Sequence, residues 1–121
     1  MNEKAKETLS DKYDKFNCII KVMDFIRENY SKNHSIEDYA NYCNLNKYYF
    51  IKLFNEYAGE TPYHFKSKLR TDKAKELLEN TNMTNAQIAE KIGYSSSFYF
   101  SRIFKKHTGI SPDAYRKMFK K

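Results

Sequence analysis

A polar helix face in residues 96–112 has the chemistry to bind a partner outside its own domain. This stretch reads SSFYFSRIFKKHTGISP. Phe100, Ile103 and Phe104 recur at three- and four-residue steps, so they are predicted to share the inward face of a helix. The opposite face carries Ser97, Phe98, Ser101, Arg102 and Lys105. Hydroxyls, a guanidinium and an ammonium are seldom buried. We therefore expect this face to form hydrogen bonds to an external partner.

The same pattern occurs earlier in the chain, in residues 46–62, which read NKYYFIKLFNEYAGETP. At a constant offset of 50, Tyr49, Phe50, Phe54, Gly59 and Pro62 match Tyr99, Phe100, Phe104, Gly109 and Pro112. The outward residues of this first copy are Lys47, Tyr48, Ile51, Lys52 and Asn55. Two related helices are thus predicted to present two different outward faces.

A tight turn is predicted before each of these helices. Asn44 and Gly93 match at an offset of 49, and both residue types tolerate the left-handed backbone that such a turn needs. Each repeat therefore reads as a short helix, a turn and a longer helix, which is the helix-turn-helix pattern with the second helix as the recognition helix. Two copies are fewer than a solenoid needs.

The whole chain is predicted to be all-α, with about seven helices. Residues 1–12 read as a tail or a frayed helix start, 13–61 as the first lobe, 62–80 as a linker helix and 81–121 as the second lobe. The first recognition helix is expected over residues 47–57, with Tyr57 facing inward. A linker helix of about 18 residues would span roughly 27 Å. Its expected packing positions include Tyr63 and Leu69, and Arg70 is expected among its charged positions.

Composition limits the possible partners. The net charge of +7 is unevenly distributed: residues 1–60 hold nine Lys/Arg and ten Asp/Glu, whereas residues 61–121 hold thirteen and five. A basic half-chain favours a polyanionic partner. The sequence has neither a long apolar run nor a signal-peptide core, so we expect a cytoplasmic chain and no membrane contact. Cys18 and Cys43 form no C-x-x-C motif and are expected to be reduced, packed thiols.

Catalysis and metal binding are not expected. His34, His64 and His107 are dispersed along the chain, and no nucleophile–base pairing is visible. No His/Cys cluster has the spacing of a metal site, and no cofactor is predicted. The main alternative to nucleic-acid binding is a helical protein–protein module whose basic face meets an acidic partner. The repeated polar face favours the nucleic acid.

Three motifs carry a resemblance to the DNA-binding domain of AraC/XylS-type bacterial transcription regulators. They are L-R-x-x-x-A-x-x-L-L at residues 69–78, I-A-x-x-I-G-Y at 88–94 and Y-F-x-R-x-F-K-K-x-x-G-x-S-P at 99–112. A Tyr115–Arg116 pair follows. The resemblance implies two homeodomain-like helix-turn-helix lobes joined by a long helix, with the recognition helices in adjacent major-groove segments. Asn85 departs from the family's usual aliphatic residue, and its role stays open.

Double-stranded DNA is accordingly the predicted partner, bound by one chain per site, with RNA polymerase as a further candidate partner. Lys52, Arg102 and Lys105 are expected at phosphates, although Arg102 also suits bidentate guanine readout. Ile51 is either a tolerated surface residue or a contact to a thymine methyl group. The complete predicted DNA-binding set is Lys47, Tyr48, Ile51, Lys52, Asn55, Ser96, Ser97, Phe98, Ser101, Arg102 and Lys105.

Overall fold

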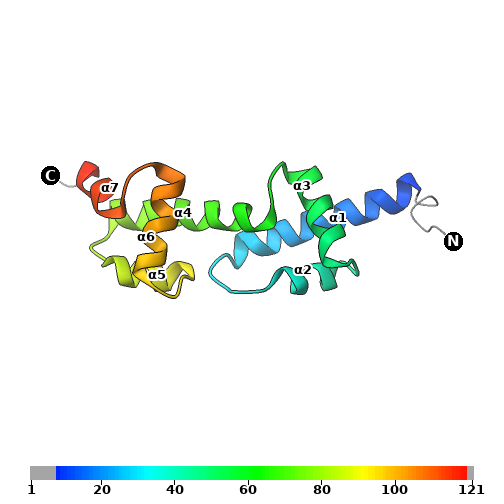
Figure 1. Cartoon of the computed structure of the whole chain (residues 1–121), viewed down its shortest axis with the longest axis horizontal. Helices are drawn as coiled ribbons and strands as arrows, with labels where there is room; N and C mark the ends of the chain where they lie inside the picture. Colours follow the sequence, from blue (N-terminus) through cyan, green and yellow to red (C-terminus); the bar gives the residue numbers. More distant parts are fainter. Residues whose placement is uncertain (1–7, 120–121) are drawn as a thin grey trace. The chain divides into compact units, whose positions relative to one another are not determined.

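A computed structural model describes residues 8–119, and within this range the regular structure consists of seven α-helices (Figure 1). They are α1 (Leu9–Glu28), α2 (Ile36–Tyr42), α3 (Lys47–Ala58), α4 (Pro62–Asn80), α5 (Asn85–Ile92), α6 (Ser97–Thr108) and α7 (Pro112–Phe119). The all-α expectation is confirmed. The first helix begins at Leu9, four residues earlier than residue 13, and the sequence expectation for residues 1–7 lies outside the described part.

The helices divide into two compact units. The first contains α1, α2, α3 and the chain as far as His64. The second contains the segment Asn29–Asn33 and the residues from Phe65 onward, so it includes most of α4 together with α5, α6 and α7. Each unit contains one helix-turn-helix pair, α2–α3 or α5–α6.

The core of the first unit is formed where α3 packs against both α1 and α2. Phe50 and Phe54 of α3 are fully buried, as the repeated phenylalanine pattern predicts. The other buried hydrophobic side chains that form this core, among the described residues, are Ile19, Val22, Met23, Ile26, Tyr39, Ala40 and Leu53. Burial of these nine apolar side chains fixes the rotation of α3 about its axis, because rotating the helix would expose the phenylalanines.

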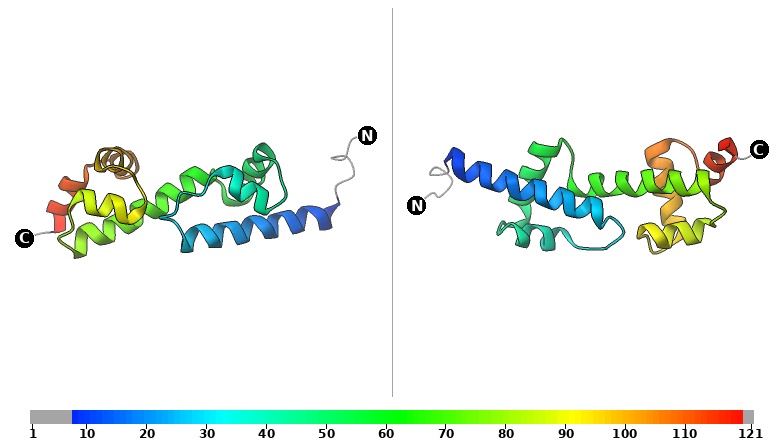
Figure 2. Two further views of the ribbon diagram at one scale, coloured as in Figure 1. Left: turned by 90° about the horizontal axis from the view of Figure 1, so that it is seen from below. Right: turned by 180° about the vertical axis from the view of Figure 1, so that it is seen from behind.

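The core of the second unit repeats this plan with α6 in place of α3. Phe100 and Phe104 are buried, and α6 packs against α5 and α7 (Figure 2). The C-terminal half of α4 supplies part of the same cluster, whose members are Ala74, Leu77, Leu78, Ile88, Ala89, Ile92, Tyr94, Phe100, Ile103 and Phe104. Half of α4 is thus an integral core element of this unit.

The two helix-turn-helix turns have the backbone geometry expected from the sequence. Asn44 has φ +56° and Gly93 has φ +106°, both in the left-handed region. The two positions differ in how crowded they are. A Cβ atom at Gly93 would lie 2.5 Å from the carbonyl oxygen of Ser31 and 2.7 Å from the Arg70 guanidinium. Glycine is therefore required there by close packing as well as by its φ angle.

Arg70, expected only among the charged positions of the linker helix, is buried. Its side chain is 6% exposed. The Nε atom donates to the carbonyl of Tyr30 at 2.7 Å, and Nη2 donates to the carbonyl of Lys32 at 3.2 Å and to Asn33 Oδ1 at 3.0 Å. Its guanidinium also lies 4.8 Å from the ring centroid of Tyr94. Hydrogen bonds to a loop offset the desolvation of this charge.

The Tyr115–Arg116 pair holds α7 against the rest of the second unit. The hydroxyl of Tyr115 donates to a Glu79 carboxylate oxygen, and Arg116 donates to the carbonyl of Met83. Desolvation, reinforced by the bond to Glu79, raises the pKa of Tyr115 to about 12. At the start of the preceding helix-turn-helix, Asn85 Nδ2 donates to Asp113 Oδ1 at 3.0 Å. This contact gives Asn85 a structural role in linking α5 to α7.

Cys18 and Cys43 form a disulfide, so the expectation of two reduced thiols is wrong. Cys18 lies on α1, and Cys43 is the C-cap of α2. Their Cα atoms are 5.8 Å apart, within the range that a disulfide bridges. Sequence spacing missed the pair because packing of separate helices, rather than a local motif, brings the two residues together.

Two tyrosines expected to face inward are largely exposed. Tyr63 is 55% exposed on the first turn of α4, where Phe65 is buried instead. Tyr57 is 48% exposed, although its ring contacts that of Phe16 at a centroid separation of 5.9 Å. Helical periodicity locates a stripe correctly, but it does not tell how far along a helix the neighbouring elements continue to cover it.

We expect Phe54→Ala and Phe104→Ala each to lower the free energy of unfolding by about 3–5 kcal/mol, because each change empties fully buried core space. Lys52→Ala and Arg102→Ala, on the opposite faces of the same helices, should change it by no more than about 0.5 kcal/mol. Urea unfolding followed by circular dichroism measures all four. Equal losses for the charged and aromatic positions would contradict the assignment of faces.

The disulfide should stabilise the first unit by restricting its unfolded state. We expect the double variant Cys18→Ser/Cys43→Ser to lose about 3 kcal/mol, the magnitude for a loop of a few tens of residues. Addition of dithiothreitol to the oxidised wild type should lower its thermal midpoint, while the double variant should not respond. If reductant left the wild-type midpoint unchanged, a stabilising disulfide would be excluded.

Candidate nucleic-acid interface

The outward face of α3 presents four residues at i, i+3, i+4 and i+7. Tyr48 is 78% exposed, Lys52 and Asn55 are exposed, and Ile51 is half-buried at the edge of the face. Residues at this spacing are neighbours on a helix surface. The structure therefore brings these predicted residues together as one continuous patch, composed of an aromatic ring, an apolar side chain, an ammonium and an amide.

Lys47 belongs to the same end of α3, but it is already engaged. Its Nζ lies 3.4 Å from Glu37 Oε2 on α2 and 5.9 Å from the ring centroid of Tyr48. A backbone hydrogen bond and the pairing with Lys47 lower the pKa of Glu37. Both partners are substantially exposed, so the pair contributes little to stability. Glu37 is a residue that the sequence reasoning missed.

The outward face of α6 has the same spacing with different chemistry. Phe98 is 72% exposed, and the guanidinium carbon of Arg102 lies 6.0 Å from its ring centroid. Lys105 is exposed, and Ser101 is half-buried, as is Ile51 at the matching position of the first unit. An aromatic ring and a guanidinium thus lie near each other on the side of α6 opposite its core.

Both recognition helices begin with a matched N-cap. The side chain of Asn46 accepts from the backbone N–H of Tyr49 at 2.8 Å, and that of Ser96 accepts from Tyr99 at 3.1 Å. Ser96 therefore has a structural role in addition to its predicted contact with DNA. Ser97 is half-buried at the first helical position. The remaining backbone N–H groups of each first turn suit an anionic oxygen.

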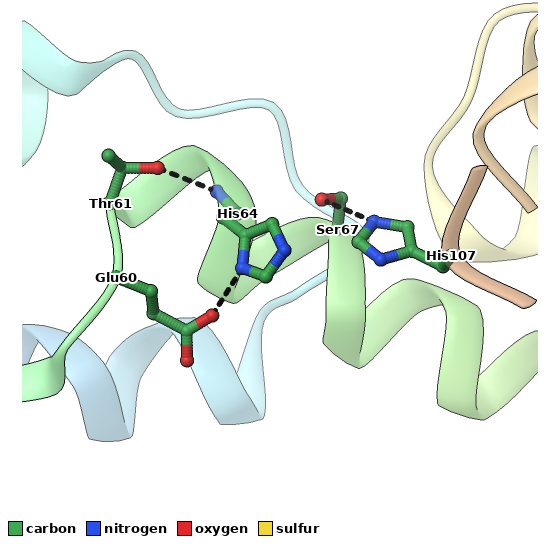
Figure 3. Close-up of polar contacts among 5 residues, drawn as sticks. All are labelled: Glu60, Thr61, His64, Ser67 and His107. Atoms are coloured by element: carbon green, nitrogen blue, oxygen red, sulfur yellow. Dashed lines mark hydrogen bonds and ion pairs between the residues drawn. The ribbon is translucent and has the colours of Figure 1, made fainter.

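Two of the histidines have hydrogen-bonding partners within their own unit. In the second unit, His107 Nε2 lies 3.1 Å from Ser67 Oγ (Figure 3). In the first unit, the His64 ring is paired with Glu60, and the His64 backbone N–H donates to the Thr61 hydroxyl (Figure 3). Among the described residues, no group of three or more His, Cys, Asp or Glu side chains could hold a metal ion.

Lys66 on α4 has a lowered pKa. Burial, together with the neighbouring Arg70 guanidinium, lowers the pKa of Lys66 to about 8. Lys66 therefore keeps its charge at pH 7 but loses it at a lower pH than an ordinary lysine. In the part of the chain that the structure describes, no helix is long and apolar enough to span a bilayer.

A family model described as a helix-turn-helix domain matches residues 39–118. The chain is 37% identical over 116 residues to the raffinose operon transcriptional regulatory protein RafR of Pediococcus pentosaceus. This alignment covers 96% of the chain but only 39% of RafR, so the chain spans about two fifths of that relative's length.

Solved structures have the same fold. The C-terminal domain of AraT, a response regulator from Geobacillus stearothermophilus, superposes with a TM-score of 0.79 at 31% identity and covers 84% of each chain. The DNA-binding domain of AdpA, solved in complex with a target DNA, also gives a TM-score of 0.79. It is 23% identical, over 84% of this chain and 91% of AdpA's domain, and so supports the fold alone. Because the family model covers well over half of its length, the chain belongs to the AraC/XylS-type helix-turn-helix family of transcription regulators.

Proposed function

We propose that this chain binds duplex DNA with sequence preference in the control of transcription, with α3 and α6 as its two recognition helices. The observation that carries the proposal is the matched pair of exposed faces, Tyr48-Ile51-Lys52-Asn55 and Phe98-Ser101-Arg102-Lys105, each on the second helix of a helix-turn-helix. An α-helix fits the major groove, and these residue types make phosphate and base-edge contacts there.

The comparisons support this proposal without extending to its details. RafR is by its name a transcriptional regulator of the raffinose operon, and the AdpA domain was solved with its target DNA. An acidic protein partner would also accept a basic face. It would not require a repeated helix-turn-helix with exposed residues at matching positions of both second helices.

We assign a DNA contact to each residue of the two faces from the exposure and the length of its side chain. Lys52, Arg102 and Lys105 have flexible cationic side chains, and we assign them to phosphates, with Arg102 also able to read guanine. Tyr48 and Phe98 occupy matching positions and are strongly exposed, which suits contact with thymine methyl groups or sugar edges. Lys47 contributes after its pairing with Glu37 is exchanged for a phosphate contact.

We further propose one chain per DNA site, a cytoplasmic location and RNA polymerase as the protein partner in the regulatory complex. The first part rests on the two recognition helices within one chain, which replace the two subunits of a helix-turn-helix dimer. The cytoplasmic location and the contact with RNA polymerase follow from the proposed role in bacterial transcription.

The charged residues on the outward face of α6 should determine the affinity for DNA and how that affinity depends on salt concentration. With about six phosphate contacts, log K should fall with log salt at a slope near −5. Arg102→Ala should weaken binding, and loss of a phosphate contact should reduce the magnitude of the slope by about 1. Lys117→Ala, an exposed charge on α7, is the matched control. Fluorescence anisotropy with duplex and single-stranded DNA measures both, and a salt-insensitive affinity would contradict the proposal.

The preferred DNA site should be asymmetric, because the two recognition faces differ in sequence. Selection of bound duplexes from a random pool, followed by footprinting, should give a non-palindromic site of about 20 base pairs, two half-sites about 10 base pairs apart. Analytical ultracentrifugation should give one chain per duplex. A palindromic site that requires two chains, or protection confined to one major-groove segment, would overturn this proposal.

A further inference from the structure

A pocket of about 420 Å³ lies between α1 and α2 in the first unit, apart from the outward residues of α3 that form the proposed DNA face. Its volume falls within the range of small-molecule sites. The residues that line it come from Lys21–Glu28 of α1 and from His34–Tyr42 in and before α2. None of them belongs to the set assigned to DNA, so the pocket is separate from the proposed DNA-binding residues.

Aromatic rings form much of the pocket wall. The ring centroids of Phe25 and His34 are 5.2 Å apart, and those of His34 and Tyr39 are 6.1 Å apart. Phe25 is 42% exposed and Tyr42 is 64% exposed, although both are large and line the same pocket. These rings offer apolar area and π faces that a ligand would cover on binding.

The charges around the pocket are predominantly negative. Asp24, Glu28 and Asp38 line it, against the single cation of Lys21. Asp38 Oδ2 accepts from the Ser35 backbone N–H at 2.9 Å, and the hydrogen bonds with Ser35 lower the pKa of this carboxylate, which is ionised at neutral pH. Asp24 pairs with Arg27 at 2.8 Å, so it is only partly available. An anionic ligand would be repelled by this arrangement.

The combination of rings and carboxylates identifies a ligand class. An organic cation gains from the negative faces of aromatic rings and from nearby carboxylates, whereas a neutral ligand gains only from apolar contact. A metal ion is a poorer fit, because the described residues contain no cluster of three or more ligating side chains. We propose that the pocket between α1 and α2 binds a small organic cation, a quaternary ammonium or a protonated amine on an aromatic body.

The place of the pocket gives such a ligand a short path to a recognition helix. Tyr39 is 5% exposed, and its ring also stacks against Phe50 of α3 with centroids 6.4 Å apart. A ligand against Tyr39 is therefore one side chain away from the core of the first helix-turn-helix. Binding itself does not depend on whether the chain recognises DNA, so the two proposals can be tested separately.

The probe for the test is benzyltrimethylammonium, with benzyl alcohol as its neutral comparison. Each is titrated into the full chain in the absence of DNA, and binding is followed by ¹H–¹⁵N correlation spectra. We expect saturable shifts for amides of α1 and α2, and an affinity about five-fold or more higher for the cation than for the alcohol. Absence of saturation, equal affinities, or shifts confined to other helices would each overturn the proposal.

Variants at two exposed positions distinguish the contribution of a carboxylate from that of an aromatic ring and leave the core unchanged. Glu28→Gln removes a charge and Tyr42→Ala removes a ring, and each should weaken benzyltrimethylammonium binding by about three-fold or more. Glu90→Gln on α5 is the matched charge control and should bind like wild type. Thermal melts verify that each variant is folded. If Glu28→Gln and Glu90→Gln bound the cation equally well, the proposed role of the pocket carboxylates would be wrong.

Discussion

Burial of two phenylalanines on one side of each recognition helix is the constraint on which the interface depends. Phe50 and Phe54 in α3, and Phe100 and Phe104 in α6, are each no more than 1% exposed. Rotation of either helix would bring this apolar area into water, at a cost of roughly 1.5–3 kcal/mol for each side chain. The opposite side is thereby held toward solvent, so the core determines which residues can meet a partner.

Buried polar groups provide a second constraint that is specific to the second unit. Arg70 donates to the Tyr30 and Lys32 carbonyls, and the glycine at position 93 leaves room for its guanidinium. In the first unit the equivalent turn residue is Asn44, whose environment does not demand the absence of a side chain. The two repeats therefore share a helical pattern but use different interactions to hold their turns.

The helices and core positions could be predicted because they follow from local periodicity and from a repeat within one chain. N-caps and left-handed turn residues were predictable for the same reason, since each depends on residues within four positions of one another. The disulfide between Cys18 and Cys43, the bonds of Arg70 and the contact of Asn85 with Asp113 join residues 25 to 40 positions apart. No local pattern encodes such pairs, and sequence patterning assigns Arg70 no role beyond supplying charge on its helix.

The outward faces could be placed on the correct side of their helices, but their chemistry depends on neighbours that spacing does not reveal. Lys47 forms an ion pair with Glu37 of the adjacent helix, whereas Arg102 lies near the ring of Phe98 on its own helix. The first face thus begins with a cation that is paired with a carboxylate, whereas the second carries, in the middle of α6, a cation that lies near an aromatic ring. A repeated core combined with divergent surface chemistry allows the two helices to recognise different sequences while keeping one packing solution. This difference is the physical reason to expect that the second unit contributes more of the electrostatic attraction and the first unit more of the apolar contact.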